Sequence, residues 1–139
     1  RTYSCCIAVD VSPSMAEHLL DCAMETLVML VEGLKEVGVD QFSVLLFGET
    51  VHVIKTEAME WGPACVLSLL SSLQPDKHGC TRDADGIEVA LQLLQESSVN
   101  SNQKLFVLTD GHTSCGMPLI RALKQAQDSQ VEVIAFGVG

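Results

Sequence analysis

Apolar residues recur along this chain in two patterns, as short continuous runs and as longer stretches with helical spacing. Continuous runs without alternating polar positions are typical of strands in a parallel sheet that is covered on both faces. Such runs predict strands over residues 5–9, 42–47, 105–108 and 131–136. A shorter run, 51–54, follows a Gly48-Glu49-Thr50 turn and predicts an antiparallel strand at the edge of the sheet.

Helices are predicted between these runs, over residues 15–37, 63–74, 85–96 and 118–128. We expect Gly38 to end the first helix. The second helix is expected to bury Val66, Leu67, Leu70 and Leu73. The third helix is expected to bury Ile87, Ala90, Leu91 and Leu94. The fourth helix is expected to bury Leu119, Ile120, Leu123 and Ala126.

The alternation of strands and helices predicts an α/β fold in one domain over residues 1–139. We expect a doubly wound, mainly parallel sheet with helices on both faces and one short antiparallel edge strand. The last predicted strand, 131–136, is apolar on both faces, so we expect it not to lie at an uncovered edge. This favours a fragment of a larger multidomain protein, in which one more strand and helix follow.

Composition and charge narrow the range of partners. Apolar residues make up 47% of the 139 residues, which indicates a globular chain, and no apolar stretch is long enough to predict membrane insertion. The net charge is -10, from 18 acidic and 8 basic residues, and the basic residues form no run. This argues against binding to nucleic acid or to anionic membranes, and it favours basic or metal-bridged partners.

The six cysteines form no Cys-x-x-Cys pair and no zinc spacing. Cys5 and Cys6 are adjacent in an apolar run, where a free thiol behaves as a small hydrophobic group. We therefore expect reduced cysteines and an intracellular protein, in the cytoplasm or nucleus. A disulfide or redox role for Cys80 and Cys115, which fall in predicted loops, stays open as an alternative.

Oxygen-bearing side chains follow the first predicted strand at every second position. Asp10, Ser12 and Ser14 would share one face of an extended segment, and Asp10 sits at the carboxyl end of its strand. A set of oxygen donors suits a hard cation such as Mg2+. Ser14 and Glu17 also match a capping box at the start of a helix, so the motif alone does not decide between the two interpretations.

Two further segments add candidate ligands. Asp110 follows the 105–108 strand, and Thr81 lies in the loop before the third predicted helix. If the first strand and the 105–108 strand are adjacent, Asp10 and Asp110 lie side by side. Two carboxylates would then balance a divalent cation, with the hydroxyls of Ser12, Ser14 and Thr81 as neutral ligands.

Taken together, these motifs resemble a von Willebrand factor type A domain with its metal-ion-dependent adhesion site. The resemblance rests on Asp10-x-Ser12-x-Ser14, Thr81 and Asp110 in Leu108-Thr109-Asp110-Gly111, in the family's order. It implies Mg2+, with Mn2+ or Ca2+ as alternatives, held by the three hydroxyls with the two carboxylates near it, often through water. It also implies an open coordination position for an exposed Asp or Glu of a protein partner. The first two predicted strands are most similar to intracellular members such as midasin.

Four other residues are candidates for the rim of the site, where a partner would make contact: Glu49, Asp83, His112 and Thr113. Each has an ordinary alternative role. Glu49 is a turn residue, Asp83 can cap a helix, and His112 and Thr113 can be solvated loop residues.

The leading interpretation is a metal-dependent protein-binding module that is not an enzyme. A Mg2+-dependent phosphoester hydrolase is the alternative, because Asp10 and Asp110 could flank a catalytic ion. Neither Asp motif contains a Lys or Arg to hold a phosphate, and the chain has no phosphate-binding glycine-rich loop. A structural domain within a larger assembly is a further alternative.

Overall fold

The centre of the sheet is a strand with apolar side chains on both faces. The computed structural model describes residues 3–11, 15, 18–48, 50–72, 83–96, 102–110 and 116–137. β1 (Tyr3–Asp10) is buried at every position after Tyr3. It lies between two parallel neighbours, β2 (Phe42–Phe47) and β4 (Asn102–Thr109). The first strand and the strand before Asp110 are therefore adjacent, as the carboxylate pair requires.

The described sheet has five strands in the order β3-β2-β1-β4-β5. β3 (Val51–Lys55) is antiparallel to β2 and forms one edge, as predicted. β5 (Val131–Gly137) pairs in parallel with β4 and forms the other edge. The expectation that a further strand and helix follow β5 in a larger protein is not tested by this arrangement and stays a prediction. Ile134 and Phe136 are only half-buried there, so the apolar character of this strand is not matched by full burial.

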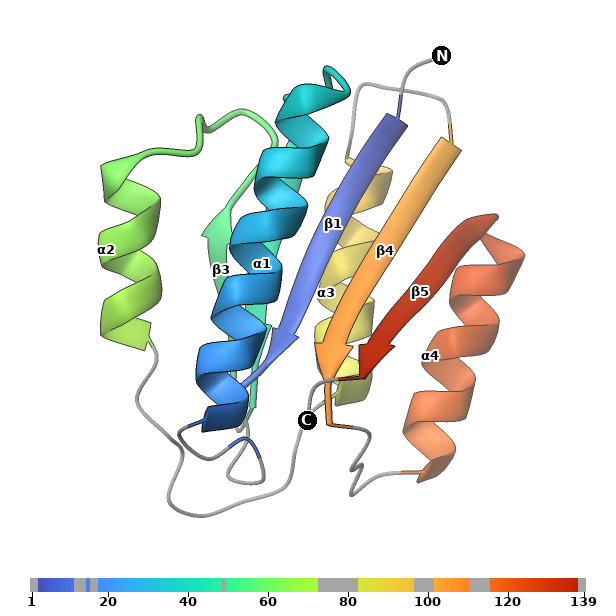
Figure 1. Ribbon diagram of the computed structural model, residues 1–139. Helices are drawn as coiled ribbons and strands as arrows, with labels where there is room; N and C mark the ends of the chain where they lie inside the picture. Colours follow the sequence, from blue (N-terminus) through green and yellow to red (C-terminus); the bar gives the residue numbers. More distant parts are fainter. Residues whose placement is uncertain are drawn as a thin grey trace.

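Helices cover both faces of the sheet (Figure 1). α1 (His18–Glu36) and α2 (Pro63–Ser72) pack on one face, and α3 (Asp83–Gln95) and α4 (Gly116–Asp128) pack on the other. The side chains of β1 alternate between the two layers, because successive residues of a strand point to opposite faces. Cys5, Ile7 and Val9 join the α1 layer, and Cys6 and Ala8 join the α3 layer. This arrangement confirms the doubly wound, mainly parallel fold.

The end of α1 follows the predicted glycine signal. Gly38 has φ of 81°, a left-handed conformation that costs little for a residue without Cβ. The amide of Gly38 donates to the carbonyl of Lys35, and the amide of Val39 donates to that of Leu34. These two bonds form a Schellman motif. The described part of the helix begins at His18, and Met15, where the predicted helix begins, is not helical.

The predicted face of α2 is wrong and that of α4 is wrong in part, because another stripe of each helix faces the sheet. In α2 the buried residues are Cys65 and Leu69, whereas the expected set is exposed at the described positions Val66, Leu67 and Leu70. In α4 the expected residue Ala126 is buried, together with Ala122, whereas the expected residues Ile120 and Leu123 are exposed. Leu73 and the side chain of Leu119 lie outside the described residues. The stripe expected for α3 is confirmed.

No helix in the described ranges is long and apolar enough to cross a membrane.

A close contact fixes α3 against the carboxyl end of β2. A Cβ atom on Gly86 would lie 2.9 Å from both Cβ and Cγ of Phe47, the last residue of that strand. The carbonyl of Phe47 also accepts a hydrogen bond of 2.9 Å from the amide of Val11. The start of α3, the end of β2 and the segment leaving β1 are thus held together at the carboxyl ends of the parallel strands.

We expect Gly86→Ala to lower the free energy of unfolding by about 1–2 kcal/mol, because the clash with Phe47 outweighs the gain in helix propensity. Gly33→Ala is the matched control, since Gly33 is exposed in α1 with nothing within 4 Å of its virtual Cβ. That variant should be stabilised by up to about 1 kcal/mol. Urea denaturation of the two variants measures both effects, and equal stabilisation of both would contradict the contact.

Candidate functional site

Asp10 is a carboxylate at the end of a buried strand. Its side chain follows Cys6 and Ala8 on the row that faces α3, and the residue is 0% exposed. Thr109 Oγ1 donates a hydrogen bond of 2.8 Å to Asp10 Oδ2. A buried carboxylate is costly without such donors, so this bond both stabilises Asp10 and fixes the orientation of its oxygens.

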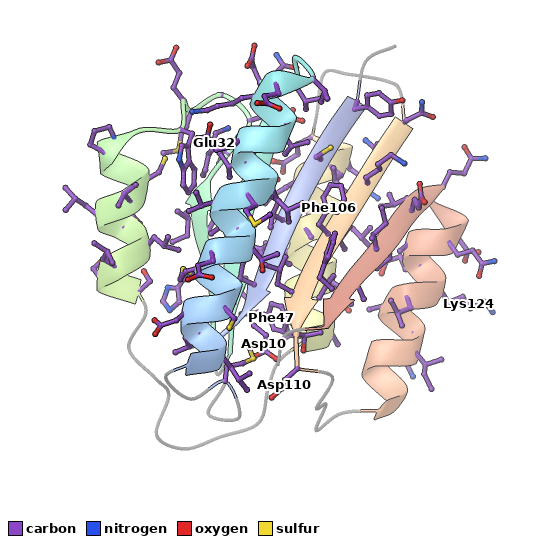
Figure 2. All side chains as sticks on the ribbon, viewed as in Figure 1. Asp10, Glu32, Phe47, Phe106, Asp110 and Lys124 are labelled. Carbon is purple, nitrogen blue, oxygen red and sulfur yellow. The ribbon has the colours of Figure 1, made fainter. Side chains whose placement is uncertain are left out.

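Asp110 lies beside Asp10, at the carboxyl ends of the parallel strands. β1 and β4 pair in parallel up to Val9 and Leu108, so the residues that follow emerge together at the carboxyl ends of the two strands. Figure 2 shows Asp10 and Asp110 at neighbouring strand ends, with Asp110 further from the core. Asp110 is half-buried, whereas Asp10 is fully buried. One carboxylate is therefore anchored in the fold and the other is open to solvent.

The role of Thr109 was not anticipated from the sequence. The residue stands in the motif Leu108-Thr109-Asp110-Gly111, yet only Asp110 in that motif was assigned a function. The missing signal was strand register, because Val9 pairs with Leu108 and the next residues, Asp10 and Thr109, are therefore neighbours. A hydroxyl at the last position of a strand, beside a buried Asp that ends the neighbouring strand, identifies the donor once the register is known.

The amino end of α3 lies at the same end of the sheet as the carboxylates of Asp10 and Asp110 (Figure 1). The contact between Gly86 and Phe47 places this helix end at the carboxyl end of β2. Ala84 is buried and Asp85 is half-buried in its first turn. The amino end of a helix carries a partial positive charge, which favours nearby carboxylates. The helix therefore adds a partial positive charge near Asp10 and Asp110.

The other predicted residues are not placed by the structure. Asp83 opens α3, but its side chain is not described. The remaining predicted ligands and rim residues lie outside the described ranges: Ser12, Ser14, Glu49, Thr81, His112 and Thr113. Cys80 and Cys115 also lie outside them. The structure thus brings together the two predicted carboxylates, and the complete ligand set stays a prediction.

The oxygen atoms at the carboxyl ends of β1 and β4 are ligands that suit a hard divalent cation. The placed groups are two carboxylates, and the described ranges hold no group of three or more His, Cys, Asp or Glu side chains that could bind a metal. Burial raises the pKa of Cys5 to about 11 and that of Cys6 to about 12, so both thiols are protonated at neutral pH and are poor ligands. An ion between Asp10 and Asp110 would need further oxygens, which the hydroxyl-bearing segments 12–14 and 81 carry.

A comparison with protein-family models matches residues 6–139 to the von Willebrand factor type A domain. The chain belongs to this family. The match includes both Asp10 and Asp110 as well as the segments that carry the predicted hydroxyl ligands. A search of curated protein sequences found no significant match.

Solved structures of low sequence identity share the VWA fold. Proximal thread matrix protein 1 from the mussel byssus, with a zinc-occupied MIDAS motif, superposes with a TM-score of 0.74 at 19% identity; 98% of this chain covers 38% of that one. Manganese-loaded TRAP protein of Plasmodium vivax gives 0.73 at 15% identity, with coverages of 99% and 57%. The VWA domain of SpRpn10 gives 0.74 at 18% identity, with coverages of 99% and 76%. The chain thus spans only part of the first two proteins.

We expect Thr109→Val to lower the free energy of unfolding by about 1–3 kcal/mol, because the buried carboxylate of Asp10 loses its hydroxyl donor while side-chain volume is kept. Thr109→Ser retains the hydroxyl and should lose less. The measurement is urea denaturation at neutral pH without added metal. A valine variant as stable as the serine variant would indicate that this hydrogen bond contributes nothing.

Proposed function

We propose that this VWA domain binds a protein partner through a divalent metal ion at the carboxyl ends of β1 and β4. The observation that carries the proposal is the pairing of a buried, hydrogen-bonded Asp10 with a half-exposed Asp110 at adjacent strand ends. Membership of the VWA family supports the same interpretation. Two carboxylates at one point repel each other, and a divalent cation relieves that repulsion.

Each residue of the proposed metal site would have a separate role. Asp10, held by Thr109, would supply a fixed negative charge from the core side. Asp110 would supply the second charge from the solvent side, and Ser12, Ser14 and Thr81 would add neutral oxygens. Because hydroxyl ligands leave a bound ion electrophilic, the ion would offer an open position to an Asp or Glu of the partner. Glu49, Asp83, His112 and Thr113 would form the rim around that position.

The identity of the ion is proposed from ligand chemistry. Mg2+ suits a set made entirely of oxygens and retains water readily, with Mn2+ and Ca2+ as alternatives. The zinc-occupied MIDAS motif of the mussel protein and the manganese-loaded state of the Plasmodium vivax protein support a divalent ion. Those ions were found in other proteins, and metal titration of this chain identifies the ion that it binds.

We propose that the domain acts inside the cell, within a larger protein or complex related to midasin. The free state of the described cysteines Cys5, Cys6, Cys22 and Cys65 supports a reducing compartment. The net charge of -10 supports a protein partner over a nucleic acid.

Calorimetric titration with Mg2+ tests the metal site. We expect saturable binding in the unmodified chain and at least about a tenfold loss in Asp110→Ala, because one of two carboxylates is removed. Asp128→Ala is the matched control, since it removes the same charge from the far end of α4 and should bind as the unmodified chain does. Equal binding by both variants would place the ion elsewhere.

The competing hydrolase function separates in a second assay. With Mg2+ present, the chain is incubated with p-nitrophenyl phosphate, and in parallel with an immobilised peptide that carries one exposed Asp. We expect no hydrolysis above the Asp110→Ala background, and capture by the peptide that EDTA abolishes. Mg2+-dependent hydrolysis that is lost in Asp110→Ala would instead support the phosphoester hydrolase.

A further inference from the structure

The outer face of α4 combines an apolar side chain with two basic side chains. Ala122 and Ala126 are buried in the core layer beneath the helix, so the opposite side of α4 faces solvent. That side carries Ile120, which is 61% exposed, together with the exposed residues Arg121 and Lys124. Figure 2 shows Lys124 on the side of α4 that points away from the sheet. We call the surface formed by Ile120, Arg121 and Lys124 the basic face of α4.

The two cations of the basic face are not neutralised within the described part of the chain. Neither Arg121 nor Lys124 forms an ion pair there, although Asp128 lies one turn after Lys124. A basic residue that precedes an acidic one by four positions is the less favourable order for such a pair in a helix. Lys104, by contrast, forms an ion pair with Glu132. The basic face therefore keeps its positive charge available to a partner.

This positive charge is unusual in a chain whose net charge is -10. α4 carries two basic residues and one acidic residue, so its net charge is +1. α1 carries four acidic residues and one basic residue, α3 carries three acidic residues and no basic one, and α2 carries no charged residue. Of the four described helices, only α4 is therefore net basic. Its first turn contains no acidic residue, so the partial positive charge of its amino end is not offset either.

The basic face begins near the proposed metal site. α4 starts at Gly116, six residues after Asp110, at the end of the sheet where β1 and β4 end (Figure 1). At a rise of about 1.5 Å per residue, Arg121 lies about 8 Å and Lys124 about 12 Å along the helix from its start. A partner segment that reaches the metal ion is therefore also close to the basic face.

We propose that the basic face of α4 binds acidic residues that flank the metal-binding Asp or Glu of the partner protein. The inference rests on the metal-dependent function proposed above and adds a second requirement to the sequence of the partner. The Arg121 guanidinium can hold one carboxylate with two parallel N–H donors, and the Lys124 ammonium can donate to another. Ile120 would contact an apolar residue of the same segment.

Charge complementarity favours α4 over the other helices as the surface for this segment. An acidic segment is repelled by most of a chain with a net charge of -10. Because α1 and α3 are net acidic and α2 is uncharged, α4 is the described helix on which the segment meets opposite charge. The contact with α4 would form within the complex that the metal has already made, so a weak contact is enough to raise the affinity.

An anionic membrane is the other surface that basic and apolar side chains attract. Helices that lie on membranes present a broad apolar face and a cluster of basic residues. α4 exposes Ile120 strongly and Leu123 less, beside two cations, and the net charge of the chain opposes contact with anionic lipid. These observations favour an acidic protein segment as the occupant.

The test uses the peptide acetyl-Glu-Glu-Leu-Gly-Gly-Gly-Asp-Gly-Gly-Gly-Leu-Glu-Glu-amide and an analogue in which Gln replaces every Glu. Each is titrated into the 15N-labelled chain with Mg2+ at low ionic strength, and amide chemical shifts are followed by NMR. We expect the Glu peptide to bind about threefold to tenfold more tightly, and we expect it alone to shift the amides of α4. Equal affinities, or tighter binding of the Gln analogue, would overturn the proposal.

The same titrations separate failure of the basic face from failure of the metal site. Binding of both peptides with equal affinity, abolished by EDTA, would support the metal site and overturn the role assigned to α4. Absence of any Mg2+-dependent binding would overturn the proposed function and this inference together.

Matched lysine variants separate the basic face from general electrostatic attraction. Lys124→Gln should weaken binding of the Glu peptide about twofold to fivefold and should leave binding of the Gln analogue unchanged. Lys35→Gln removes the same charge from the last turn of α1, at the other end of the sheet (Figure 1), and should change the affinity by less than about 1.5-fold. The double variant Arg121→Gln/Lys124→Gln should lose the preference for the Glu peptide. Equal weakening by the two lysine variants would contradict a specific surface.

Vesicle flotation distinguishes the acidic segment from a membrane. The chain is mixed with vesicles of phosphatidylserine and phosphatidylcholine in equal amounts, and with vesicles of phosphatidylcholine alone. We expect no binding to the anionic vesicles above the neutral background. Binding that is lost in the Arg121→Gln/Lys124→Gln variant would assign the basic face to a membrane and would overturn the proposal.

Discussion

The arrangement of the site at the carboxyl ends of β1 and β4 depends on the burial of the Asp10 carboxylate. The apolar strand β1 is packed from both faces, so the position of Asp10 is fixed by the core rather than by a loop. A carboxylate in such a place needs donors or a cation. Thr109 supplies one donor from the adjacent strand. A cation shared with Asp110 would stabilise the same charge further, so the fold and the proposed metal site favour each other.

α3 links the carboxylates to the core. Its amino end lies beside them, held there by the close contact between Gly86 and Phe47. The partial positive charge of this helix end favours negative charge at the site. Because the buried stripe of α3 packs against the sheet, the position of that partial charge is set by the core.

Much of this architecture follows from local pattern, and the exceptions have physical causes. The strands and the stripe of α3 are predictable because their apolar residues fall in a single register. α2 and α4 carry apolar residues on more than one face, and the face that packs inward is decided by tertiary contacts that the local pattern does not contain. Asp10 and Asp110 could be paired from strand order alone. Thr109 could not be assigned, because a hydrogen bond across strands depends on register and on the depth of burial.

The net charge of the chain explains why an acidic partner would need a metal ion. A chain with a net charge of -10 repels an acidic partner, so capture of an Asp or Glu would require an ion that reverses the local sign. Binding there would depend on the presence of the ion and would be lost on chelation. The buried Asp10 and the half-buried Asp110 would set the position of the ion, so the carboxylates that repel an acidic partner without metal would direct it to the site with metal.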